Sequence, residues 1–303
     1  MSNFDKLIKN INEFIAKSEN EEDSIIHDVE EFPGIENLPQ LAEDFEAGIA
    51  KLLRRQKKFY VDAFNEFISK DDLNTLGAFL NFMQQDLFAE DDFVEEFGKE
   101  AAKFLNLTTE ELTKLMMESI DRDVSFNVLS KRTTDWIQNW SSELAKIMQL
   151  STHKALEKEL IQAIEAGESI AQAELRIKEL PQFDRKRART TAQTEILTAS
   201  SQAHYESFMQ SPAVVGKTWK HSGTKKNNPR PTHVAMDGVT IPVDDYFEVD
   251  GERGLFPRDP NFSAKNRVHC GCVIGPSVDK NILGLSAEEK EQIRQEVLAE
   301  MNS

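Results

Sequence analysis

Proline is distributed very unevenly along this chain, and its distribution sharply limits the possible folds. Of the ten prolines, two are Pro33 and Pro39 and the other eight lie at Pro181 or beyond, so 141 consecutive residues contain no proline. Eight of the thirteen glycines also follow residue 180. Proline breaks helices, whereas turns between short strands need proline and glycine. We therefore predict a mostly α N-terminal region followed by a small α+β domain, with one long helix and short antiparallel strands.

The length of the chain and the positions of its prolines and glycines also indicate how it is divided into domains. A hydrophobic core stops growing at about 250–300 residues, so 303 residues favour more than one domain. We predict four parts: an acidic arm and linker (1–39), a helical region (40–168), an α+β domain (169–280) and a C-terminal helix (281–303).

Apolar periodicity and capping residues predict the individual elements. The expected helices cover residues 40–69, 93–97, 108–120, 133–149, 152–166, 169–180, 183–210 and 286–301, and a further one is capped by Asp71 or Asp72 and runs through Met83. Thr108 or Thr109 before Glu111 predicts a separate helix start. The segments 217–223, 239–243, 245–251 and 269–275 are candidate strands, and Asp237-Gly238 is a hairpin signal.

Charge is also unevenly distributed. The net charge is −17, and it resides in residues 1–180, since residues 181–303 sum to zero. This acidic half argues against indiscriminate binding of nucleic acid. A basic helix start is the candidate contact for DNA or an acidic partner, and we expect it to pack against the acidic helices: Arg185, Lys186, Arg187 and Arg189. We expect no membrane span and no secretion signal, because no apolar run reaches about 18 residues.

Most of the residues suited to chemistry lie near the C-terminal end. Cys270 and Cys272 flank one glycine, which places both thiols on the same side of an extended segment. With His233 or His269 and one further ligand they are candidate metal ligands, with His233 the preferred histidine, and zinc is the possible cofactor. The alternative is a pair of small buried thiols beside a turn. His233 and Asp237 suit acid–base chemistry, but Asp237 pairing with Arg230 is the simpler interpretation.

An ordered set of short motifs points to a known family. The set comprises R-A-x-x-x-A-x-T-E from Arg187 to Glu195, K-x-W ending at Trp219, R-P-x-H from Arg230 to His233, Asp237-Gly238, and Cys270-x-Cys272. Residues 170–278 thereby resemble the Mu F-like domain of phage minor head proteins, also called head morphogenesis proteins. We interpret Glu195 as the anchor of a buried ion pair rather than a base.

The resemblance implies a structural minor head protein of a tailed bacteriophage, without enzymatic activity. Such a protein binds at the portal vertex in few copies and assists procapsid assembly, DNA packaging or genome ejection. Its implied partners are the portal protein and also scaffolding or capsid protein, with local DNA contact. Its implied location is the virion, in the head interior or at the portal vertex, and the host cytoplasm during assembly. The alternatives are a metal-dependent hydrolase and a DNA-binding module.

Overall fold

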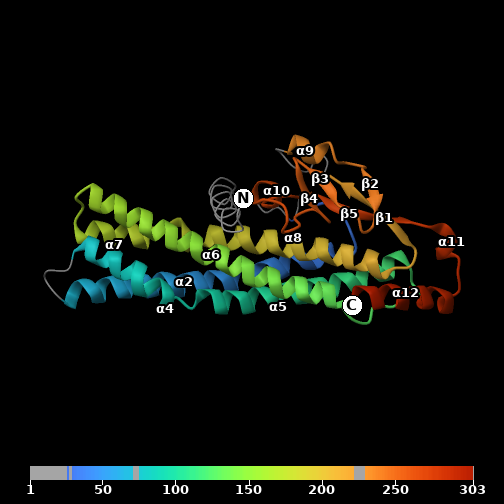
Figure 1. Ribbon diagram of the computed structural model, residues 1–303, viewed down its shortest axis with the longest axis horizontal. Coiled ribbons are helices and arrows are strands. Elements are labelled where there is room, and N and C mark those ends of the chain that lie inside the picture. Colours follow the sequence, from blue (N-terminus) through green and yellow to red (C-terminus); the bar gives the residue numbers. More distant parts are fainter. Residues whose placement is uncertain (1–25, 27–28, 71–74, 222–228, 303) are drawn as a thin grey trace.

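Four long helices form the body of the protein. The computed structural model describes residues 26, 29–70, 75–221 and 229–302, so most of the predicted acidic arm lies outside the described residues. The four helices run along the long axis of the molecule (Figure 1): α2 (Leu38–Lys70), α5 (Phe93–Ile120), α6 (Lys131–Glu165) and α8 (Arg185–Gln210). The helices predicted over 40–69 and 183–210 are confirmed.

Short elements close one end of this bundle. These elements are α3 (Leu76–Phe82), the π-helical turn η3 (Met83–Leu87), α4 (Phe88–Glu90), α7 (Ile170–Lys178) and η4 (Pro181–Phe183), whereas the short helix η2 (Ile35–Asn37) directly precedes the start of α2. Helix α7 begins with a capping box, in which Ser169 and Gln172 satisfy each other's backbone N–H groups. Tyr60 and Phe64 of α2 pack here against residues of α3, α6 and α7.

Two of the predicted helix boundaries are wrong. Helix α5 continues through Thr108 and Thr109, and α6 continues without a break from residue 131 to 165. Thr108 and Thr109 are fully buried, so neither begins a helix. The Thr113 hydroxyl donates to the Thr109 carbonyl at 2.6 Å. Threonine within a helix can satisfy its hydroxyl in this way, so a capping pattern alone does not establish a helix start.

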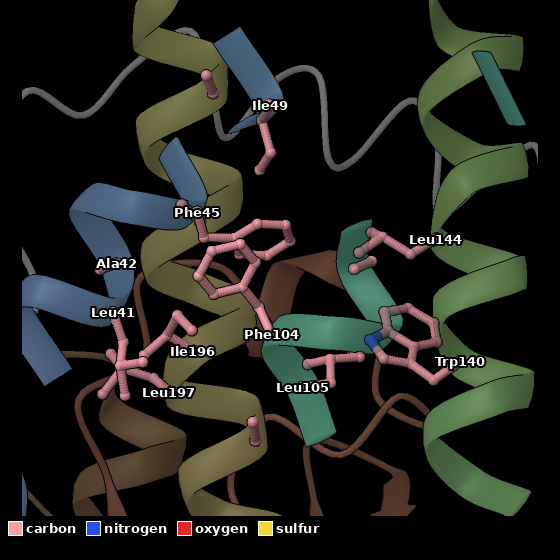
Figure 2. Packing of buried hydrophobic residues seen from close by; sticks show 14 of the residues in the cluster. Leu41, Ala42, Phe45, Ile49, Phe104, Leu105, Trp140, Leu144, Ile196 and Leu197 are labelled. Carbon is pink, nitrogen blue, oxygen red and sulfur yellow. The ribbon is translucent and has the colours of Figure 1, made fainter. Parts of the chain in front are cut away.

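The main core lies where α2, α5, α6 and α8 meet. Phe45 stacks on Phe104 with ring centroids 4.8 Å apart, and Figure 2 shows Trp140 and Leu144 of α6 approaching the same region. Helix α8 is central, because it packs along both α2 and α5 and also contacts β5. Burial of such a core is the main favourable term for folding.

The strands form two small antiparallel sheets on one side of α8 (Figure 1). In the first, β1 (Val214–Lys220) lies between β2 (Thr240–Pro242) and β5 (Val273–Val278). In the second, β3 (Phe247–Val249) pairs with β4 (Glu252–Gly254). Together with the helical region that precedes them, these strands confirm the predicted fold class.

The tight hairpin lies at a different Asp-Gly pair from the one predicted. Asp250 and Gly251 join β3 to β4 with φ values of 54° and 75°, the left-handed conformation that a two-residue hairpin turn requires. The predicted pair, Asp237-Gly238, instead lies between helix α9 (Pro231–Val234) and β2. There the Gly238 N–H donates to the Trp219 carbonyl at 2.9 Å.

The C-terminal segment returns to the helical bundle. After α10 (Ala264–Arg267) and β5, the chain forms α11 (Lys280–Leu283) and α12 (Ala287–Met301). Lys290 lies 2.8 Å from Asp121 at the end of α5, and buried Arg294 donates to Gln210 of α8 at 2.9 Å. Within the described ranges, none of the helices is long and apolar enough to cross a membrane.

Candidate functional site

The fold brings the three predicted metal-ligand residues together. His233 lies in the short helix α9, while Cys270 and Cys272 lie just before β5. The His233 Nδ1 atom is 3.4 Å from the Cys270 Sγ and 3.6 Å from the Cys272 Sγ. All three side chains are buried, and their ligand atoms lie within 4.8 Å of one another. Both cysteines are free thiols.

The two thiols influence each other's protonation. The pKa of Cys270 is well below its ordinary value, because its thiolate accepts hydrogen bonds from the Cys272 thiol and from His233. The pKa of Cys272 is well above its ordinary value, because its proton is shared with Cys270 and because burial penalises a second charge. The pair therefore favours one thiolate, on Cys270, and one thiol, on Cys272, unless a cation lies beside the two sulfur atoms.

Arg258 holds the backbone that carries both cysteines. Its buried guanidinium donates to the carbonyl oxygens of Cys270 at 2.5 Å and Cys272 at 2.7 Å. The same group donates to the Leu197 carbonyl at 3.0 Å and to the Ser201 hydroxyl at 2.6 Å, both on α8. Arg258 thus ties the cysteine segment to the centre of the bundle.

Other motif residues position the surrounding loops. Arg230 donates to the Val268 carbonyl at 2.6 Å, and the Asp237 carboxylate accepts the His221 backbone N–H at 2.9 Å. Arg230 and Asp237 therefore hold separate backbone segments, which differs from the predicted pairing of their side chains with each other. Trp219 is fully buried and meets the His233 ring edge to face, with ring centroids 5.7 Å apart.

Glu195 forms the buried ion pair that the sequence indicated. Its carboxylate accepts the Trp140 indole N–H at 2.6 Å and lies 3.1 Å from the Arg267 guanidinium. Arg267 also lies over the Trp140 ring, 4.2 Å from its centroid. Burial raises the pKa of Glu195, although Arg267 and the indole oppose this shift. The contacts join α6, α8 and α10, which is a packing role.

The predicted basic cluster is divided between two environments. Arg185 and Arg189 form ion pairs with Glu46 of α2, at 2.6 Å and 3.1 Å, so these two side chains do contact an acidic residue of the helical region, although α2 as a whole carries six basic and five acidic side chains. Lys186 is half-buried. Arg187, predicted to share this contact, instead points inward, because residues two apart on a helix lie on different faces.

Arg187 is surrounded by neutral acceptors. Its guanidinium donates to the carbonyls of Gln182 and Met148, each at 2.8 Å, and to the Ser151 and Thr152 hydroxyls at 2.5 Å and 3.0 Å. Burial lowers the pKa of Arg187 to about 9. The side chain therefore joins α6 to the start of α8 and is not available to DNA.

Sequence reasoning missed Arg258 and Arg267. Arg258 lies between Pro257 and Pro260 with Asp259 directly after it, and nothing in this short stretch distinguishes it from an exposed loop arginine. Arg267 lies three residues before Cys270, and nothing in the local pattern indicates that it pairs with Glu195, 72 residues away.

The fold and this ordered motif place the chain in a class of phage head morphogenesis proteins. A family model described as "Phage Mu protein F like protein" matches residues 154–275. The chain belongs to this family, a structural phage protein family. It is 53% identical over 304 residues to "Uncharacterized protein YqbB" of Bacillus subtilis (strain 168), covering 99% of this chain and all of the relative. No solved structure matches the chain.

Proposed function

We propose that the protein is a structural minor head protein of a tailed bacteriophage that binds at the portal vertex in few copies. It assists procapsid assembly, DNA packaging or genome ejection, and it does not turn over a substrate. The observation that carries the proposal is membership of the Mu F-like family, supported by the full-length match to one relative.

The roles of the motif residues support a structural protein. Arg187 and Glu195 lie in the part of the chain that the family model matches. Both are buried and form hydrogen bonds between helices. Asp237 accepts a backbone N–H of a neighbouring loop. The motif residues therefore stabilise the fold of the domain, and a stable fold is what an assembly component needs.

The charge distribution supports protein partners over DNA. The chain carries a net charge of −17, and two of the exposed arginines, Arg185 and Arg189, share an ion pair with the single carboxylate of Glu46. An acidic surface is repelled by packaged DNA and favours docking onto basic protein surfaces. The proposed partners are therefore the portal protein and, during assembly in the host cytoplasm, scaffolding or capsid protein. The proposed final location is the virion, in the head interior or at the portal vertex.

The test is the copy number in purified particles. Procapsids and mature heads from a phage that encodes the chain are separated on gradients, and the protein is quantified by mass spectrometry against the portal and major capsid proteins. We expect a few copies per particle, comparable to the portal and far below the capsid protein. Absence from both particles would overturn the proposal. Comparison with heads emptied in vitro then shows whether the protein leaves with the DNA.

A further inference from the structure

We propose that His233, Cys270 and Cys272 bind one zinc ion, which fastens helix α9 to the start of strand β5. The site is independent of the head-protein assignment, because it rests only on the arrangement of these three side chains. They come from two segments of the chain that are 37 residues apart at their nearest, so the ion would act as a cross-link between them.

The distances match those of a tetrahedral zinc site. Zinc binds cysteine sulfur at about 2.3 Å and histidine nitrogen at about 2.0–2.1 Å, so neighbouring nitrogen and sulfur ligands lie ~3.6 Å apart. The observed Nδ1–Sγ distances are 3.4 Å and 3.6 Å. All pairs of ligand atoms in the cluster lie within 4.8 Å. An ion fits between them with only small side-chain shifts.

The chemistry of the three ligands selects the metal. Two thiolates and one imidazole suit zinc, whereas magnesium and calcium prefer oxygen ligands. Two thiolates also balance the charge of one divalent ion, so the occupied site is neutral. This matters because His233, Cys270 and Cys272 are at most 2% exposed, and an unbalanced charge is costly in such an environment.

The residues around the cluster hold the ligands in place before a metal arrives. Arg258 fixes the carbonyls of both cysteines, and Trp219 packs at right angles to the His233 ring. These contacts limit the movement of the cysteine backbone and of the imidazole ring, whereas the Nε2 atom of His233 is buried without a hydrogen-bond partner among the described residues. With Nδ1 on the metal, the ring proton lies on Nε2, which is the neutral form that coordinates.

The fourth ligand comes from solvent. Among the described residues, the cluster of ligand-type atoms contains only these three side chains. The segment 222–228, which lies outside the described residues, has the sequence SGTKKNN and contains no histidine, cysteine or acidic residue. In the proposed site a water molecule or a small thiol occupies the fourth position, as in other zinc centres with three protein ligands.

The first experiment measures metal in the full-length protein. Protein purified without a metal-binding tag or chelator is analysed by plasma mass spectrometry, and apoprotein is titrated with zinc alone. We expect about one zinc per chain, and less than a tenth of that in Cys270→Ser, Cys272→Ser and His233→Asn. His153→Asn is the matched control, because His153 is also a buried histidine but lies in α6, beside Asp91. It should retain full zinc. Metal-free protein that takes up no zinc would overturn the proposal.

A second measurement uses the wild-type protein, so its result does not depend on whether the variants fold. A thiol reagent is added to the folded wild-type chain while released zinc is followed with a chromogenic chelator. We expect the two thiols to react slowly, and one zinc to be released as both are modified. Replacement of zinc by cobalt should give the visible absorption of a tetrahedral site and a thiolate charge-transfer band. Two fast-reacting thiols with no zinc release, or a disulfide with no free thiol, would contradict a zinc site.

Discussion

Arg258 joins the cysteine segment to α8, and Arg258→Lys tests how much this connection stabilises the fold. The guanidinium is fully buried and reaches four acceptors in two directions, two on α8 and two in the cysteine segment. Lysine keeps the positive charge, but its donors lie on one nitrogen. That nitrogen cannot reach both α8 and the Cys270 and Cys272 carbonyls.

The size of the effect follows from the hydrogen bonds that lysine cannot make. A hydrogen bond to a charged group contributes about 1.5–3 kcal/mol, and lysine should lose two of the four. The expected loss in the free energy of unfolding is therefore about 3–6 kcal/mol. This is a large part of the total of about 5–15 kcal/mol that is usual for a folded protein. Both residues carry a Cβ, so the left-handed backbone at position 258 (φ 69°) is equally strained in each.

Urea denaturation followed by circular dichroism and tryptophan fluorescence measures the effect. Arg253→Lys is the control, because Arg253 is exposed on β4 and only stacks over the Tyr246 ring, 4.9 Å from its centroid. The control should change the free energy of unfolding by no more than about 0.5 kcal/mol. The argument would be refuted if the free energy of unfolding of Arg258→Lys lay within about 1 kcal/mol of wild type with an unchanged denaturant slope. The guanidinium would then not be needed to donate to both α8 and the cysteine segment.

Three further predictions concern buried polar groups. Glu206→Ala should cost about 3–6 kcal/mol in urea unfolding, since its buried carboxylate accepts two hydrogen bonds from Ser130, from the backbone N–H at 2.6 Å and from the hydroxyl at 2.9 Å, and each contributes about 1.5–3 kcal/mol; a loss below about 1 kcal/mol would contradict this. Trp140→Phe should cost about 1–3 kcal/mol, because Glu195 loses the indole donor, and a thermal midpoint equal to that of wild type would show that the bond contributes nothing. Burial lowers the pKa of His204 from 6.5 to about 3, so the unfolded chain takes up a proton first as the pH falls. Stability should therefore decrease from pH 6.5 towards pH 3, by about 2 kcal/mol between pH 6.5 and 5, and His204→Phe should show less of this decrease; an identical pH profile in the variant would refute the assignment.

Local sequence patterns were sufficient for much of the secondary structure. Helix α12 begins with the capping box of Ser286 and Glu289, and α7 with that of Ser169 and Gln172, both of which lie within four residues of sequence. The absence of proline between Pro39 and Pro181 agrees with the long helices α2, α5 and α6. Such signals can be read locally because their physical causes are local.

The same kind of reasoning failed where a local signal competed with a distant partner. Thr108 and Thr109 form a good capping pattern, yet both are buried inside α5. The Thr109 hydroxyl faces the Ala199 carbonyl of α8, 90 residues away. Helix α8 is the extreme case: its sequence is polar, but nearly all of its 26 residues are buried. Hydrophobicity alone could not predict this.

The fold class and the family could be inferred from the amino-acid sequence, which also offered Cys270 and Cys272 as candidate metal ligands. The folded structure was needed to show that His233 lies within ligand distance of Cys270 and Cys272, and that Arg187 points inward while Arg185 and Arg189 reach Glu46. It also revealed Arg258 and Arg267, whose hydrogen-bond partners are 9 to 72 residues distant. This difference arises because a buried polar side chain is stable only when distant segments supply its partners, and no local pattern records which segments those are.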